Sequence, residues 1–181
     1  MKILVLASAS ILAFATPAMA QSNDVSFIEQ IGNQNSATVD QNGGTQLSVI
    51  EQLGSNDTAL VEMNGSNNIS AVKQQASAFV GGGNRSENRM SGMGDQNYVT
   101  QSGAKNVSYT TFDPDARNTV SAISQDGANN FVDYTSTGAN NNSLITQVFD
   151  GNKAEVFQYG SNAISVVSQN GLENVAKVTQ R

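Results

Sequence analysis

The sequence predicts an all-β protein, a β-solenoid of about seven two-strand coils with two facing parallel sheets. A residue pattern recurs every 11 positions through nearly the whole chain, and the regular positions within each repeat are spaced by two. A spacing of two is typical of a strand, in which alternate side chains share one face. Each repeat is therefore expected to hold one strand, and two repeats, a 22-residue unit, to make one coil.

The most regular position closes each strand. It is Gln in ten of fourteen repeats and Met63, Met90, Phe112 or Ser136 in the others. Stacked coils would place Gln over Gln, so that side-chain amides hydrogen-bond along the rod as in cross-β ladders. The expected Gln ladder residues are Gln30, Gln41, Gln52, Gln74, Gln101, Gln125, Gln147, Gln158, Gln169 and Gln180.

Two residues before the closing position is a column of mostly β-branched residues, and four before it is a small residue. Both columns share the Gln face and are expected to fill the space between two sheets about 10 Å apart. The intervening column is polar apart from Phe157 and is expected to face solvent. The predicted core residues are Ile28, Val39, Ile50, Val61, Val72, Val99, Ile123, Ile145, Val156, Val167 and Val178.

Asn dominates the position six before the closing residue, and Gly recurs two after it. Stacked Asn side chains are expected to form a second ladder, and Gly suits a tight reversal that needs positive φ or close backbone approach. The ladder residues are Asn35, Asn68, Asn106, Asn130, Asn141, Asn152 and Asn174. The turn residues are Gly32, Gly43, Gly54, Gly65, Gly103, Gly127, Gly138, Gly160 and Gly171.

An 11-residue period is also compatible with a right-handed coiled coil. Frequent Gly, Val, Thr, Ser and Asn give poor helix propensity, which excludes that alternative. The repeat is interrupted by five extra residues in an irregular excursion at about 75–89 and by two around "DPDARN".

The first twenty residues indicate a secretory signal. Lys2 gives a positive start, an apolar run follows, and Ala18-Met19-Ala20 fits a cleavage site. We therefore expect residues 1–20 to be removed, residues 21–181 to form the solenoid domain, and the product to be secreted and not membrane-spanning.

Composition excludes several function classes. Without Lys2 the chain has eight basic and fifteen acidic residues, a net charge of −7, which argues against nucleic acid as the primary partner. Cys and His are absent, so the usual nucleophilic triads are impossible. We expect no enzyme, no catalytic or metal site and no cofactor. "GGGNRSEN" and "SGMGD" are only faintly similar to calcium-binding repeats, and the outer columns lack the Thr pairs of an ice-binding surface.

The expected first and last strands are ordinary repeats rather than caps. Open strand edges invite another copy of the same chain, which predicts end-to-end polymerisation. Acidic residues in the Asn column, namely Asp24, Asp57 and Asp95, are expected to slow premature assembly by repulsion.

The motif Q-x-G-x-x-N-x-A-x-x-x-Q resembles the curlin repeat of bacterial curli subunits. Two copies fit in full, Gln30-Gly32-Asn35-Ala37-Gln41 and Gln169-Gly171-Asn174-Ala176-Gln180. The resemblance implies a secreted subunit that passes through the periplasm and self-assembles into extracellular amyloid fibres for adhesion and biofilm matrix. It also implies a second curlin subunit, an outer-membrane export channel and periplasmic chaperones as partners.

Two features depart from that family. Its major subunit carries a glycine-rich leader, whereas only residues 21–23 precede the first expected strand here. The closing "VTQR" resembles the minor, nucleating subunit, yet basic residues are few near this end. Major and minor roles both stay open, as does a monomeric β-solenoid adhesin; a polysaccharide-active enzyme is the least favoured alternative.

Overall fold

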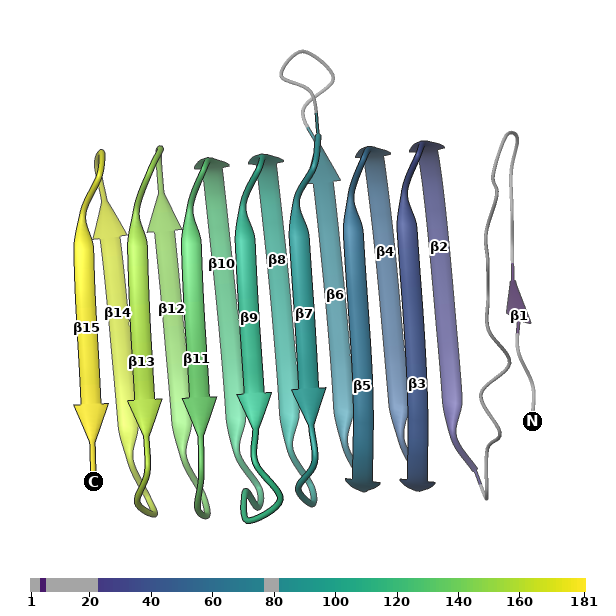
Figure 1. Cartoon of the computed structure of the whole chain (residues 1–181), viewed down its shortest axis with the longest axis vertical. Coiled ribbons are helices and arrows are strands. Elements are labelled where there is room, and N and C mark those ends of the chain that lie inside the picture. The colour runs from purple at the N-terminus through teal and green to yellow at the C-terminus, as the bar shows by residue number, and fades with distance from the viewer. Residues whose placement is uncertain (1–3, 6–22, 77–81) are drawn as a thin grey trace.

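A computed structural model describes residues 4–5, 23–76 and 82–181. In these residues the chain is all-β, without a helix, and fourteen successive strands form about seven stacked coils. Figure 1 shows the strands side by side in two layers, with β2 and β15 near opposite ends of the row. The β-solenoid predicted from the 22-residue period is confirmed.

Strands alternate between the two parallel sheets. Sheet A holds β1 (Leu4–Val5), β2 (Val25–Asn33), β4 (Leu47–Ser55), β6 (Ile69–Ala76), β8 (Gln96–Ala104), β10 (Val120–Ala128), β12 (Asn142–Val148) and β14 (Ile164–Asn170). Sheet B holds β3 (Ser36–Gly44), β5 (Thr58–Ser66), β7 (Arg85–Met90), β9 (Val107–Phe112), β11 (Phe131–Ser136), β13 (Lys153–Gln158) and β15 (Val175–Gln180).

The register places matching columns on top of one another. Val39 pairs with Val61 across β3 and β5, and Gln30 pairs with Gln52 across β2 and β4. Parallel stacking of neighbouring coils supplies the backbone partners that a lone two-strand coil lacks. The two insertions fall between strands and leave the stacking register intact.

The core lies between the sheets. Nine of the eleven predicted core residues are buried, and the other two, Ile28 and Val178, are partly buried against the same cluster. Met63, Met90, Phe112 and Tyr134 complete the cluster in sheet B. The apolar column therefore runs the length of the rod, which gives every coil a share of buried apolar area.

The irregular excursion is shorter than expected. Gln75 and Ala76 finish β6, and residues 85–89 belong to β7, in register with β5 and β9. Residues 85–90 stay in the sheet because their inward side chains, Ser86, Asn88 and Met90, stack on the inward side chains Ala59, Val61 and Met63 of β5. The core of the expected excursion, 77–81, lies outside the described residues.

Most of the predicted signal sequence also lies outside the described residues. Within it, only Leu4 and Val5 are described, and they pair with Phe27 and Ile28 at the edge of β2. The β2 edge of sheet A was expected to be open, but in the full chain two of its positions are paired. In sheet B, β3 has only β5 beside it among the described strands, so its other edge is open.

Candidate functional site

A continuous ladder of glutamines runs through the interior along sheet A. Each side-chain Nε2 donates to the Oε1 of the next Gln, at 2.6–3.0 Å, so the ladder has one direction. Its members are Gln30, Gln52, Gln74, Gln101, Gln125, Gln147 and Gln169.

The same glutamines tie the two sheets together. The Nε2 of Gln52 also donates to the carbonyl of Ser36 in sheet B at 3.0 Å, and that of Gln125 donates to Val107 at 3.0 Å. In the five interior members, Gln52, Gln74, Gln101, Gln125 and Gln147, the amide nitrogen thereby uses both hydrogens. This arrangement explains how so many amides are tolerated in the interior, where an unpaired polar group is costly.

Sheet B does not continue this ladder, which corrects the expectation for Gln41. The column reads Gln41, Met63, Met90, Phe112, Ser136, Gln158 and Gln180, and only Gln158 donates to the next Gln, at 2.9 Å. Gln41 donates instead to the carbonyl of Val25 at 3.2 Å. Met, Met and Phe cannot carry an amide ladder, so packing replaces hydrogen bonds in these coils.

In sheet B, the stretch of the Gln column that holds Met63, Met90 and Phe112 ends in an aromatic pair. The rings of Phe112 and Tyr134 meet edge to face with centroids 5.6 Å apart, and the Tyr134 hydroxyl donates to Oε1 of Gln158 at 2.8 Å. The ladder resumes at that point. Burial raises the pKa of Tyr134, so the hydroxyl keeps its proton for this bond.

The Asn column bonds mainly to the backbone, and the expected amide-to-amide bonds join only Asn106 to Asn84 at 3.2 Å and Asn174 to Asn152 at 3.0 Å among the described residues. The side-chain oxygens accept the backbone N–H of the same position in the next coil. For example, the backbone N–H of Asn152 donates to Oδ1 of Asn130 at 2.9 Å. The Nδ2 donates to a turn carbonyl, as from Asn152 to Gly171 at 2.9 Å. In sheet B the column holds Asn35, Asp57, Asn84, Asn106, Asn130, Asn152 and Asn174, joined throughout by such bonds.

In sheet A the Asn column is mixed. Asn68 precedes Asp95, and Asn141 precedes Ala163, yet their Oδ1 atoms still accept the following backbone N–H at 3.0 Å. A backbone donor is present whatever the next side chain is. Like-upon-like stacking is therefore unnecessary for this column.

The turn glycines are explained mainly by close backbone approach. A Cβ on Gly32 would overlap the carbonyl oxygen of Gly54, and one on Gly65 would overlap that of Gly92. Gly32 also has a φ of 123°, whereas Gly65 lies outside the left-handed region. Positive φ and close backbone approach, the two reasons given in the sequence prediction, thus both contribute. Close backbone approach is the reason that these two turns share.

A second turn position was missed by the sequence analysis. The residue just before the Asn column has positive φ in every coil. Gly and, to a lesser degree, Asn tolerate this left-handed corner best, and recurring Asn was the available signal. The positions are Asn23, Gln34, Thr45, Asn56, Asn67, Gly83, Gly94, Lys105, Asn118, Asn129, Asn140, Gly151, Asn162 and Glu173.

Three carboxylates, Asp24, Asp57 and Asp95, are buried where other coils have Asn. Asp57 and Asp95 are fully buried, and each has one oxygen without a hydrogen-bond partner. Burial raises the pKa of both, and that of Asp95 reaches about 6 although Thr119 donates its N–H to the other oxygen at 2.9 Å. Burial opposes the charged form more than this bond favours it.

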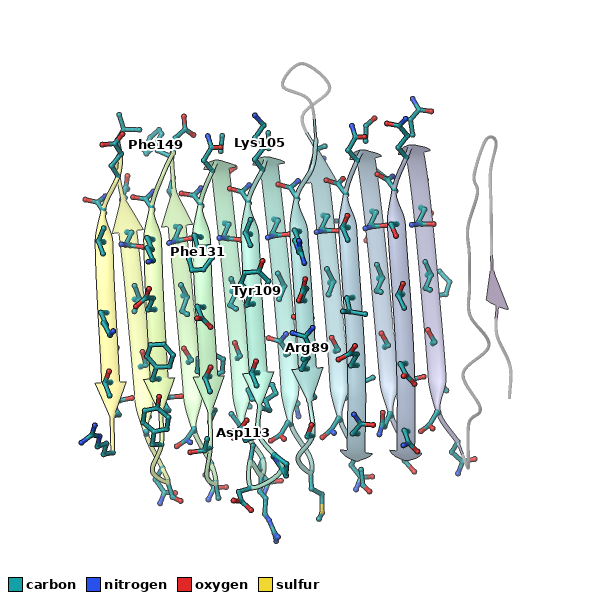
Figure 2. The ribbon with its side chains drawn as sticks, in the orientation of Figure 1. Arg89, Lys105, Tyr109, Asp113, Phe131 and Phe149 are labelled. Carbon is teal, nitrogen blue, oxygen red and sulfur yellow. The ribbon has the colours of Figure 1, made fainter. Side chains whose placement is uncertain are left out.

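The outer face of sheet B carries charges and aromatic rings. Figure 2 shows Tyr109 and Phe131 on neighbouring strands of the near face, and their centroids are 5.9 Å apart. The guanidinium of Arg85 and the ammonium of Lys153 lie 5.8 and 5.5 Å from these rings. Such contacts at exposed positions add modestly to stability.

The last coil is less covered than interior coils. Val156 is fully buried, whereas Val178, its partner in β15, is only partly buried. Val175 and Ile164 are 76% and 69% exposed. A further coil placed here would cover Val178, as β15 covers Val156, and extend both ladders.

In the described part of the chain, no helix is long and apolar enough to cross a membrane, and no three Asp or Glu residues gather as metal ligands. Comparison with known protein families, with curated proteins and with solved structures finds no match.

Proposed function

We propose that this protein is a secreted structural subunit that polymerises end to end into a cross-β fibre. The observation that carries the proposal is that the first and last coils present matching columns. Gln30 and Gln169 occupy one position in sheet A, and Gln41 and Gln180 occupy one in sheet B. A second copy stacked on the last coil would therefore meet the same side chains that interior coils meet.

The ladder direction makes this stacking head to tail. Every Gln bond in sheet A runs from the lower to the higher residue number, and Gln169 uses one Nε2 hydrogen on the carbonyl of Lys153 at 3.0 Å. Its second hydrogen would be donated to Oε1 of Gln30 in the next copy. Because all strands are parallel, β14 would pair with β2 of that copy in the same sense.

The N-terminal edge fits the same scheme. Leu4 and Val5, which pair beside β2 in the full chain, belong to the predicted signal sequence. Its cleavage would free the β2 edge at the time of export. Assembly would then begin only after secretion, which is consistent with an extracellular product.

The repeat motif and the rod together support a fibre of the curlin type, used for adhesion and biofilm matrix. A second curlin subunit, an outer-membrane export channel and periplasmic chaperones are the partners that such a fibre would need. We assign the chain as fibre-forming and leave the nucleating role as the alternative.

Substitutions in β15 test the proposal. Val178 faces inward and Thr179 faces outward on the same strand. Purified Val178→Lys should fold but fail to extend seeded fibres, because a buried ammonium would block the next coil. Thr179→Lys should extend them, and wild-type fibres should give a meridional reflection near 4.8 Å. Equal growth of both variants, or a wild-type protein that stays monomeric, would exclude end-to-end assembly; the second result favours a monomeric adhesin.

A further inference from the structure

The outer face of sheet A is apolar along the whole rod. Its two outward columns nearest the strand starts hold twelve apolar residues among fourteen, and none is charged. We call these columns the apolar face; they are Val25, Leu47, Ile69, Gln96, Val120, Asn142 and Ile164, and Phe27, Val49, Ala71, Tyr98, Ala122, Leu144 and Val166.

The matching columns of sheet B are different. Six of their fourteen side chains are charged: Arg85, Glu87, Asp133, Lys153, Glu155 and Lys177. In the sequence, one 11-residue column mixes the two faces, so that Leu144, Glu155, Val166 and Lys177 follow one another. Alternation of strands between sheets separates them, and the rod has one apolar and one charged outer face.

The apolar face is accessible. Val166, Val25 and Leu144 are 67%, 49% and 45% exposed, and they lie on β14, β2 and β12. Exposed apolar side chains are therefore present from one end of the rod to the other. Contiguous apolar areas of this kind on soluble proteins usually mark an interaction surface.

The dimensions fit a second copy of the same face. Seven strands about 4.8 Å apart, each with about six residues of which three face the partner, give roughly 35 Å by 20 Å, or about 700 Å². Two such faces would bury roughly 1,400 Å², within the usual range for a stable protein interface. The face is thus large enough without any other partner.

The adjoining outward column sets the relative direction of the two rods. It starts with Glu29, Glu51 and Lys73, and continues with the small residues Thr100, Ser124, Thr146 and Ser168. Lys73 pairs with Glu51 at 2.9 Å, which leaves excess negative charge at the first coil. A two-fold axis along the strands makes the rods antiparallel and places this charge against Ser168. A two-fold axis along the rods keeps them parallel but reverses the strands, so that it places the charge against the apolar columns.

We propose that two rods of this chain pair laterally and antiparallel through the apolar face. Small hydroxyl and Ala side chains among the larger ones allow two flat sheets to interdigitate about 10 Å apart, as in steric zippers. The pairing goes beyond end-to-end growth and does not require it, because two single rods already offer enough area.

A double substitution tests the pairing. Val49→Lys with Leu144→Lys places two charges on the apolar face, at β4 and β12. Thr38→Lys with Thr135→Lys adds the same charge to the outer face of sheet B, at β3 and β11, which directly precede β4 and β12 in the chain, and serves as the control. All four side chains point outward, so both variants should fold with the wild-type circular dichroism.

Mass per length from scanning transmission electron microscopy gives the readout for fibres, and sedimentation velocity gives it for soluble protein. We expect two chains per axial repeat for wild type and control, and half that mass for the apolar-face variant. Wild-type filaments of single-rod mass, or paired filaments of the variant, would overturn the pairing and leave growth intact. A soluble dimer that never elongates would support the pairing and count against fibre growth; a soluble wild-type monomer without filaments would overturn both.

Discussion

Replacing Asp95 with Asn should stabilise the rod and remove much of its pH dependence. The equivalent Asn68, directly before β6, donates its Nδ2 to the carbonyl of Gly92 at 3.1 Å. Oδ2 of Asp95 and the carbonyl oxygen of Ala116 instead both lie beside Gly92. Both atoms are acceptors, and Oδ2 receives no hydrogen bond. Asn at this position would supply the missing N–H.

The magnitude follows from the pKa. Burial raises the pKa of Asp95 from 3.8 to about 6, so the folded protein binds more protons than the unfolded chain between these values. The contribution of Asp95 to stability is therefore greatest below pH 4 and falls as the pH rises through 6. A difference of about two pH units corresponds to roughly 3 kcal/mol lost by pH 7.5. The Asn variant should recover up to that amount.

Urea unfolding of monomeric protein at pH 4 and pH 7.5 measures the effect. Asp95→Asn should match wild type at pH 4 and exceed it at pH 7.5. Asn68→Asp, in the neighbouring coil of the same column, is the control and should acquire a similar pH dependence.

The double variant Asp57→Asn, Asp95→Asn should also shorten the lag of fibre growth. Equal stability of wild type and Asp95→Asn at pH 7.5 would refute the reasoning, and an unchanged lag would refute the idea that these carboxylates slow assembly.

Three further substitutions test the interior and the turns by the same urea assay. Gln101→Leu leaves the donor of Gln74 and the acceptor of Gln125 unpaired and should cost roughly 1–3 kcal/mol for each. A total cost below about 0.5 kcal/mol, the lower end of what one hydrogen bond contributes, would mean that the ladder is not stabilising. Gly65→Ala should cost more than about 1 kcal/mol, because its Cβ overlaps the carbonyl of Gly92, and a neutral result would show that the coils can move apart. Asn129→Val should cost about 1–2 kcal/mol at a φ of 58°, whereas Asn129→Gly should be nearly neutral; equal effects would argue against the left-handed corner.

The period of 11 and the spacing of two were sufficient to predict the strands, the coil length and the inward columns. They could not predict which inward columns bond side chain to side chain, because that depends on reach. Gln extends to the next Gln, whereas the shorter Asn side chain meets a backbone N–H. The sequence pattern also could not separate the outer faces, since Leu144 and Glu155 occupy the same repeat position on opposite sheets.

The structure of the fibre by electron cryo-microscopy tests the central claim most directly. The account predicts that each rod adds one chain per axial rise of about 34 Å, seven strand spacings of about 4.8 Å, with β14 paired to β2 of the next copy. A rise of about 4.8 Å per chain, in which each molecule lies flat as one layer, would contradict it.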